Sequence, residues 1–379
     1  MNDGKIYDTA IIGGGLAGLT LSISLAKQGF LVVLFEKETY PFHKVCGEYI
    51  SLESWHYLET EMCIPLKEMN LPIIKKLWIT SPNGNTLNSD LDLGGFGISR
   101  YTLDNTLKTI AENIGVTILQ NCKAEDVQFI ENIFKIKTTK GIYQSKVCCG
   151  SWGKRSNFDV KWKRPFTSKT SDRLNNFVGI KYHVKTDFPD DTIALHNFKD
   201  GYCGISKIED DKYCVCYLTK ASNIKNAGSV EKTEEQVLAE NPHLKKLFGS
   251  MIKLYDAPVS ISQISFSKKK AVENNVLMLG DAAGMITPLC GNGMSMAMHS
   301  AKLAAANITA FLQNNITRQQ LEGNYTSEWK NIFSTRVKIG KFIQYLFGRK
   351  AVTNLFVSLM KQSSSLTNKI ISLTHGKEF

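Results

Sequence analysis

The thirty residues from Tyr7 to Glu36 read YDTAIIGGGLAGLTLSISLAKQGFLVVLFE, and this stretch decides the fold. An apolar run at residues 7–12 predicts a strand, small and apolar residues at helical spacing over 16–28 predict a helix, and the apolar run at 30–35 predicts a second strand. These elements together have the length of a right-handed βαβ crossover. We therefore expect an α/β fold built around a parallel sheet.

A glycine pattern separates the first strand from the helix. Gly13 permits the tight turn that leaves the strand, Gly15 lets a pyrophosphate approach the backbone, and Gly18 allows the helix to pack closely on the strand. Leu16 and Ala17 fall in the first helical turn, where free N–H groups and the partial positive charge of the helix favour phosphate. The pattern predicts a dinucleotide site at these five residues.

An acidic residue closes the second predicted strand. Glu36 stands 23 residues after Gly13, the spacing at which a carboxylate accepts hydrogen bonds from a ribose diol. Lys37 follows it directly, and we include both residues in the predicted cofactor site. NAD and FAD share this part of the ligand, so the first unit does not choose between them.

A second glycine-rich segment makes that choice. Residues 276–283 read VLMLGDAA, which places Asp281 after a predicted strand, and Gly291-Asn292-Gly293-Met294 precedes a predicted helix. This pattern resembles that of the para-hydroxybenzoate hydroxylase-type flavoproteins, a superfamily that includes group A monooxygenases, geranylgeranyl reductase-like enzymes and flavin-dependent halogenases. The resemblance implies FAD as the cofactor, bound by a Rossmann-like three-layer domain.

The resemblance also implies roles for the residues of this segment. Asp281 would bind the ribityl or ribose part of FAD, and the backbone amides near Gly293 and Met294 would face the N1–C2=O edge of the flavin. The helix that begins at Gly293 would stabilise negative charge near N1 of a reduced flavin. Pro288 and Gly291 belong to the same predicted cofactor turn.

Two shorter segments are similar to the same superfamily. Arg100 stands in an Arg-x-x-Leu-Asp pattern and would lie beside the flavin or its phosphates, while the alternative is an exposed helical ion pair with Asp104. The sequence Lys44-Val45-Cys46-Gly47-Glu48 resembles a Lys-x-Cys-Gly element of the reductase-like and halogenase-like branches. Lys44, Cys46 and Gly47 would then lie close to the flavin, with Cys46 either a functional thiol or a packing residue.

One segment departs from the pattern of the superfamily. Many relatives carry Gly-Ala-Asp-Gly where this chain has Gly150-Ser151-Trp152-Gly153, so Trp152 stands in the place of the aspartate. This departure leaves three electron donors open, which are NADPH, NADH and a separate flavin reductase.

The motifs and the strand-like runs between them predict the domain organisation. We expect an inserted β-rich substrate domain and a helical C-terminus. The ranges are 1–75, 98–165 and 262–330 for a discontinuous FAD-binding domain, 76–97 and 166–261 for the substrate domain, and 331–379 for an amphipathic helical segment.

Composition narrows the setting. The nine cysteines include no C-x-x-C pair, which is typical of reduced thiols in a cytoplasm, and the histidines show no metal-ligand spacing, so we predict no metal site. No run of about 18 uncharged apolar residues occurs, so we expect no transmembrane span. A basic N-terminal region followed by an apolar stretch is also absent, and we expect a cytoplasmic protein.

The net charge of +11 is concentrated at the C-terminal end, where residues 330–379 contain nine Lys and Arg but a single acidic residue. Apolar residues recur there at helical spacing, at Ile339, Phe342, Ile343 and Leu346 and again at Val352, Leu355, Phe356 and Leu359. Either these helices pack on the body of the protein, or they make peripheral contact with an anionic membrane. The cations alternate with apolar residues and no recognition motif is present, so we do not expect nucleic-acid binding.

The sequence thus predicts an FAD-dependent oxidoreductase. The favoured reaction is a monooxygenation, in which a flavin C4a-hydroperoxide oxidises a small lipophilic organic substrate. The rival is a geranylgeranyl reductase-like enzyme that reduces C=C bonds of an isoprenoid or lipid, and an alternative of another class is an electron-transfer or binding flavoprotein. The sequence does not indicate which side chains are catalytic, because the cofactor performs the chemistry.

Overall fold

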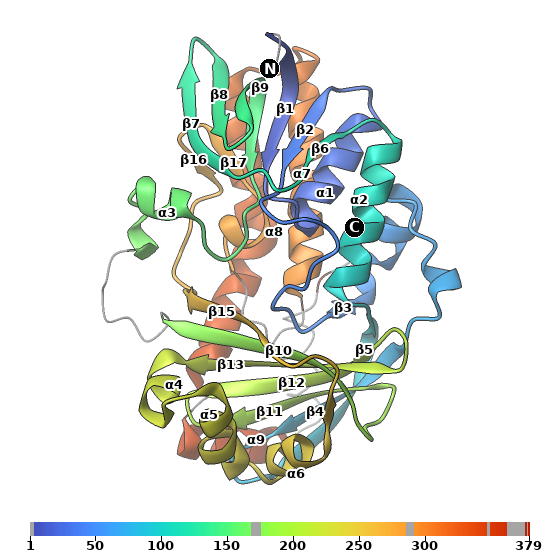
Figure 1. The fold of residues 1–379 in the computed structure, drawn as a ribbon, viewed down its shortest axis with the longest axis vertical. Helices are drawn as coiled ribbons and strands as arrows, with labels where there is room; N and C mark the ends of the chain where they lie inside the picture. The colour runs from blue at the N-terminus through green and yellow to red at the C-terminus, as the bar shows by residue number, and fades with distance from the viewer. Residues whose placement is uncertain (1–3, 168–175, 286–291, 347–348, 362–375, 377) are drawn as a thin grey trace.

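The computed structural model describes residues 4–167, 176–285, 292–346, 349–361, 376 and 378–379. Two sheets lie one above the other along the long axis of the molecule (Figure 1). In the first sheet the strand order is β16 (Val272–Glu273), β17 (Val276–Met278), β9 (Gly141–Gly150), β1 (Ile6–Ile12), β2 (Val32–Phe35) and β6 (Thr117–Leu119), with β7 (Ala124–Ile130) and β8 (Ile133–Thr138) joined to β9.

The centre of the first sheet is parallel, as the opening βαβ pattern predicts. Strand β1 pairs in parallel with β2 and β9, and β17 pairs in parallel with β9. Helix α1 (Leu16–Ala26) connects β1 to β2. Because the carboxyl ends of parallel strands meet at one edge of a sheet, the turns after β1 and β17 lie close together there.

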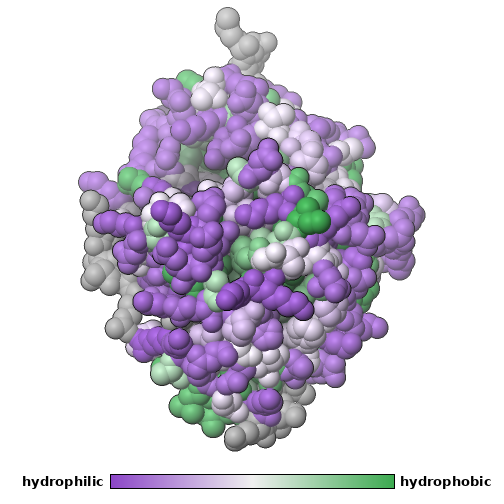
Figure 2. Space-filling view, turned by 60° about the horizontal axis from the view of Figure 1, so that its bottom comes forward, coloured by the Kyte–Doolittle hydropathy of each residue, from purple (hydrophilic) through white to green (hydrophobic). Residues whose placement is uncertain are grey.

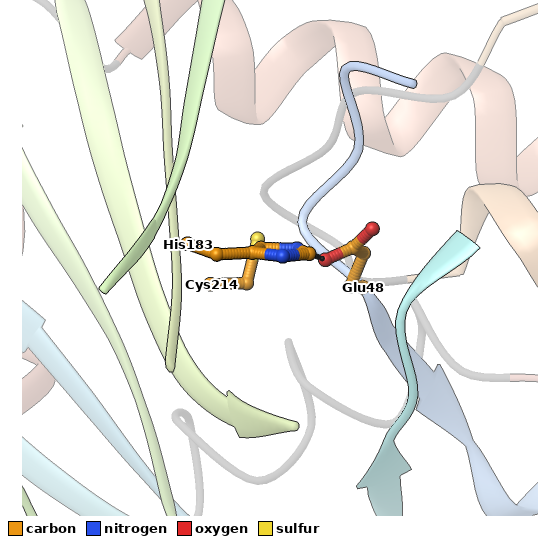
Figure 3. A group of neighbouring side chains, drawn as sticks. All are labelled: Glu48, His183 and Cys214. Carbon is orange, nitrogen blue, oxygen red and sulfur yellow. Dashed lines mark hydrogen bonds and ion pairs between the residues drawn. The ribbon is translucent and has the colours of Figure 1, made fainter. Parts of the chain in front are cut away.

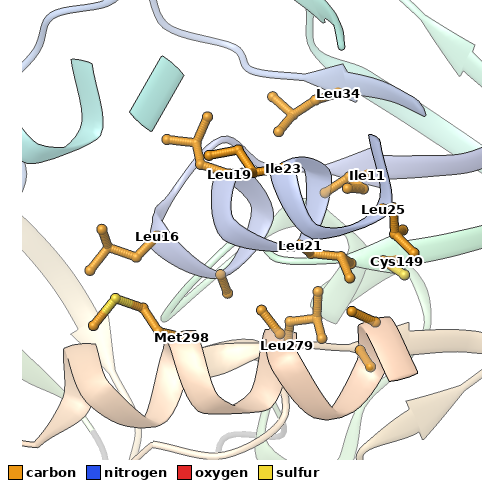
Figure 4. Close-up of a cluster of buried hydrophobic side chains, with 14 of the residues drawn as sticks. Ile11, Leu16, Leu19, Leu21, Ile23, Leu25, Leu34, Cys149, Leu279 and Met298 are labelled. Carbon is orange, nitrogen blue, oxygen red and sulfur yellow. The ribbon is translucent and has the colours of Figure 1, made fainter. Parts of the chain in front are cut away.

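Helix α1 is apolar on nearly every side because it is covered on two sides. Figure 4 shows Leu16 and Leu21 directed toward α7 (Gly293–Leu312), whereas Leu19 and Ile23 point the other way, toward Leu34 of β2. All of these leucines and isoleucines are buried. The packing fixes the N-termini of α1 and α7 relative to each other.

The second sheet is largely antiparallel and lies at the opposite end of the molecule (Figure 1). Its strand order is β14 (Ile252–Lys253), β10 (Phe177–Lys185), β13 (Lys212–Lys220), β12 (Gly201–Ile208), β11 (Thr192–Phe198), β4 (Ile73–Thr80), β5 (Thr86–Gly97) and β3 (Tyr49–Ser51), with β15 (Val259–Ile264) beside β10.

The two faces of the second sheet have different neighbours, because side chains alternate along a strand. Ile180, Tyr182 and Val184 of β10 belong to a cluster with residues of α6. The remaining helices are α2 (Arg100–Asn113), α3 (Asn157–Lys161), α4 (Ala221–Ala227), α5 (Val230–Gln236), α6 (Pro242–Ser250), α8 (Arg318–Leu346) and α9 (Lys350–Lys361). The α/β fold, with a β-rich second unit and a helical C-terminus, agrees with the prediction.

Candidate active site

A cavity of about 200 Å³ lies where the first sheet, the second sheet and the loop before β3 meet. The glycine-rich turn contributes Gly15, Leu16 and Ala17 to its wall. The predicted residues Cys46, Gly47, Arg100, Asp281, Gly293 and Met294 also line it. Segments that are far apart in the sequence therefore form one site.

Two helix N-termini open onto this cavity. Helix α1 follows Gly15 and α7 follows Asn292, and neither N-cap residue caps its helix with a side-chain hydrogen bond. Uncapped N–H groups and the positive end of each helix dipole favour anionic groups. The residues present therefore fit a cofactor with anionic groups such as FAD.

The three glycines of the first motif are constrained in different ways. A Cβ atom added at Gly15 would meet only the Arg100 and Lys44 side chains, 3.5 and 3.8 Å away, so this position is open toward the cavity. Gly13 has φ +107°, and a Cβ there would lie 2.6 Å from the Ser151 carbonyl oxygen. A Cβ at Gly18 would lie 2.1 Å from the carbonyl oxygen of Gly13. Gly13 and Gly18 shape the turn, and only Gly15 lines the cavity.

Glu36 is placed beneath the glycine turn rather than in the cavity wall. Its carboxylate accepts hydrogen bonds from the backbone N–H groups of Gly14, at 2.8 Å, and Glu38, at 3.1 Å. Lys37 is exposed and pairs with Glu38. Glu36 thus holds the turn, and its contact with a ribose stays a prediction.

Arg100 and Lys44 share one buried carboxylate. Arg100 Nε and Lys44 Nζ lie 2.8 and 3.0 Å from Asp104. Burial would raise the pKa of Asp104, but the two cations outweigh it and lower the pKa. The ion pair at i, i+4 that the sequence offered as an alternative does form, but it is largely buried, and Arg100 also lines the cavity.

The Asp281 turn is supported from behind by two buried cations. Lys269 donates to the carbonyl oxygens of Asp281, at 2.6 Å, and Lys154, at 3.2 Å. Arg164 donates to the carbonyl of Ala282 at 3.0 Å. Burial lowers the pKa of Lys269 to about 8, although the negative charge of Asp281 opposes the shift. Lys269 thereby ties two segments of the cavity wall together.

Trp152, the departure from the superfamily pattern, does not line the cavity. Its ring stacks on Phe158, with centroids 5.1 Å apart, and its Nε1 donates to Asp159 at 3.3 Å. The neighbouring Ser151, Gly153 and Lys154 do line the cavity. The tryptophan has turned into the core beside α3, so this wall lacks the carboxylate that many relatives have there.

The second sheet, together with Met285 from the segment after the Asp281 turn, supplies an apolar wall of the cavity. It is formed by Ile193, Leu195, Tyr202, Leu218, Ile264 and Met285. Most of these side chains belong to one buried hydrophobic cluster. The cavity thus has a polar end suited to a cofactor and an apolar end suited to a lipophilic molecule.

A buried ionic cluster joins the loop before β3 to the second sheet (Figure 3). Glu48 Oε1 accepts from Lys181 Nζ at 2.5 Å and from the backbone N–H of Arg100 at 2.8 Å. Glu48 Oε2 accepts from Nε2 of His183 at 2.6 Å. Glu48 lines the cavity. Lys181 and His183 lie on the same face of β10 as Gly179, which also lines the cavity.

The same cluster contains a set of possible metal ligands. Glu48, His183 and Cys214 place an oxygen, a nitrogen and a sulfur atom within 4.8 Å of one another. However, Glu48 is already bonded to three donors, and burial raises the pKa of the Cys214 thiol well above its ordinary range. These contacts satisfy the carboxylate, so we interpret the cluster as an ionic link between two parts of the fold.

Sequence patterns do not predict this cluster. Glu48 lies at the end of the Lys44–Glu48 motif, and Lys181 and His183 lie 133 and 135 positions away from it. No spacing rule connects residues at such distances. Two predicted cofactor residues, Pro288 and Gly291, lie outside the described part of the chain.

The fold and these motifs are similar to those of FAD-dependent oxidoreductases. Residues 11–44 match the family model of the NAD(P)-binding Rossmann-like domain. The chain is 26% identical to conditioned medium factor receptor 1 of Dictyostelium discoideum, over 96% of this chain and 75% of that one. It is 25% identical to digeranylgeranylglycerophospholipid reductase 1 of Methanococcoides burtonii, over 90% and 84% of the two chains.

Solved structures share the fold at lower identity. A flavin-dependent brominase superposes with a TM-score of 0.78 and 19% identity, covering 98% of this chain and 93% of that one. A protein described as a probable FAD-dependent monooxygenase from Pseudomonas aeruginosa gives 0.71 and 14%, covering 92% and 99%. These structures extend the agreement in fold to both sheets.

Proposed function

We propose that the protein is an FAD-dependent monooxygenase that oxidises a lipophilic organic molecule bound against the second sheet. The observation that carries the proposal is the composition of the cavity, where two uncapped helix N-termini face an apolar wall. FAD, when bound, would supply the redox chemistry with oxygen.

The residues of the chain would position the reactants and exclude water. Backbone amides at Leu16 and Ala17 would hold the pyrophosphate, and Asp281 would bind the ribityl or ribose part. The amides at Gly293 and Met294 would stabilise charge on the flavin. The apolar residues of the second sheet would hold the substrate in a dry environment.

A specific observation supports a second candidate, the reduction of a C=C bond in an isoprenoid or lipid. The Lys44–Glu48 loop, which resembles an element of reductase-like enzymes, brings Cys46 and Gly47 into the cavity wall. A relative named as a lipid reductase is similar over most of the chain. The third candidate, a binding flavoprotein without turnover, is supported only by the similarity to conditioned medium factor receptor 1.

Anaerobic stopped-flow absorbance distinguishes these candidates. FAD-loaded protein is mixed with NADPH or NADH, and then with oxygen, while the flavin band at about 450 nm is followed. A monooxygenase should consume oxygen in proportion to product, whereas a reductase should work better without oxygen. If neither nucleotide bleaches the flavin, an external flavin reductase is added, and failure there as well contradicts turnover of either kind.

A further inference from the structure

The two faces of helix α9 have different environments. Thr353, Val357 and Met360 are buried. Leu355 and Leu359, in contrast, are 62% and 51% exposed. The apolar stripe that the sequence predicted is therefore divided: Phe356 packs against a hydrophobic cluster, whereas Leu355 and Leu359 face outward.

The end of α8 continues this exposed apolar surface. Phe342 is 64% exposed and Tyr345 is 48% exposed, and α8 and α9 contact each other. Among the described residues, 13 large hydrophobic side chains are exposed, and four of them fall between Phe342 and Leu359. Figure 2, which turns this end of the molecule forward, shows hydrophobic side chains gathered at its lower margin.

Cationic residues flank these side chains along α8 and α9. Lys338 and Lys341 precede Phe342 on α8, and Lys350 and Lys361 are the first and last residues of α9. Lys350 pairs with Glu240 at 3.5 Å. Across residues 330–379 the sequence has nine basic residues and one acidic residue. The surface therefore combines exposed apolar side chains with an excess of positive charge.

We propose that this end of the molecule, formed by Phe342, Tyr345, Leu355 and Leu359 with the flanking lysines, docks on an anionic lipid bilayer. Apolar side chains enter the boundary between headgroups and acyl chains, and lysines interact with negatively charged headgroups. Within the described ranges no helix has both the length and the apolar composition needed to cross a bilayer. Docking would thus be peripheral and would depend on lipid charge.

The buried face of α9 connects this surface to the cavity. Val357 and Met360 belong to the same hydrophobic cluster as Leu195, Leu218 and Met285, which line the apolar wall. A bilayer at the outer face of α9 would then lie behind the wall where a lipophilic substrate would bind. This consequence rests on the proposed function, whereas the docking itself does not.

Flotation of the full chain, loaded with FAD and without substrate, tests the docking. Wild-type protein is mixed with vesicles of phosphatidylcholine alone or with about 30% phosphatidylglycerol, an anionic lipid whose charge attracts basic surfaces. The test variant carries Leu355→Asp and Leu359→Asp. The control carries Ile142→Asp and Val160→Asp, two side chains that are 60% and 57% exposed but lie on β9 and α3.

We expect wild type and control to float with the anionic vesicles and to be released by salt, and the test variant to lose about tenfold or more of its binding. Thermal unfolding and the bound flavin spectrum check that all three proteins are folded. Equal recovery of test variant and wild type, or no flotation of wild type, overturns the proposal. A wild-type dimer that the test variant converts to a monomer would instead assign the surface to a second copy and also overturn it. Because flotation requires no turnover, it can succeed or fail independently of the proposed reaction.

Discussion

Nζ of Lys181 lies 2.5 Å from Oε1 of Glu48, and both side chains are completely buried. Lys181 belongs to the second sheet, whereas Glu48 belongs to the loop that also carries Cys46 into the cavity wall. Burial alone would raise the pKa of Glu48, but Lys181 and the hydrogen bond from His183 outweigh it and lower the pKa to about 2. The ion pair between Glu48 and Lys181 therefore holds this part of the cavity wall, and each charge stabilises the other in its buried position.

Removing one member of this pair should destabilise the protein strongly. Glu48→Gln and Lys181→Met should each reduce the free energy of unfolding by about 3–5 kcal/mol, because each leaves an uncompensated buried charge or donor. The double variant should lose clearly less than the sum of the two. Urea unfolding at pH 7 measures the cycle, with Lys76→Met, whose partner Asp191 is exposed, as a control that should change little. Additive losses would contradict the coupling.

Stability should fall in mild acid because of His196. Burial, together with the nearby His243, lowers the pKa of His196 from 6.5 to about 3. Between these two values the unfolded chain binds a proton that the folded chain does not, so the free energy of unfolding decreases as the pH falls below 6.5. The free energy of unfolding, measured with urea from pH 7 to pH 4, should depend less on pH in His196→Gln than in the wild type. The substitution His56→Gln, at an exposed position, should leave the pH dependence of the wild type unchanged.

Two neighbouring glycines should respond differently to alanine. Gly15→Ala should leave the thermal midpoint almost unchanged but lower FAD affinity by about tenfold, or about 1.4 kcal/mol, because the new methyl group projects into the phosphate site. Gly18→Ala should cost about 1–3 kcal/mol of stability, because its Cβ meets the Gly13 carbonyl oxygen. Flavin absorbance per protein and calorimetry separate the effects. If Gly15→Ala instead lowered stability and left FAD affinity unchanged, the phosphate would not lie at Gly15.

The volume of the apolar end of the cavity can be made smaller by a substitution that does not change the cofactor end. A Cβ at Gly204 would make ordinary contacts, at 3.6 Å from Leu195 and 3.7 Å from the Cys216 carbonyl oxygen. Gly204→Val should therefore fold and bind FAD normally, and should weaken binding of dodecanol, used as a lipophilic probe, by about tenfold. The change in flavin fluorescence measures the binding of FAD and the binding of dodecanol. Unchanged dodecanol affinity would show that the probe binds away from this wall.

The sequence alone predicted the class of the fold, and several of the predicted cofactor residues, among them Gly15, Arg100 and Asp281, line one cavity. Gly13, Gly15 and Gly18 have requirements that lie within a few residues along the chain, and α7 begins at Gly293 as expected. Such local rules are readable because a turn, a helix start and the first residues of that helix are adjacent in sequence.

The tertiary structure decided the rest. It directed Glu36 to the backbone of its own turn, rotated Trp152 into the core, and turned Leu355 outward. It also brought Lys181 to Glu48 across 133 positions. Each outcome depends on the register of a strand or the rotation of a helix against distant neighbours, because one step along a strand moves a side chain to the opposite face. Sequence spacing carries the local geometry, and only packing between distant segments selects the partners.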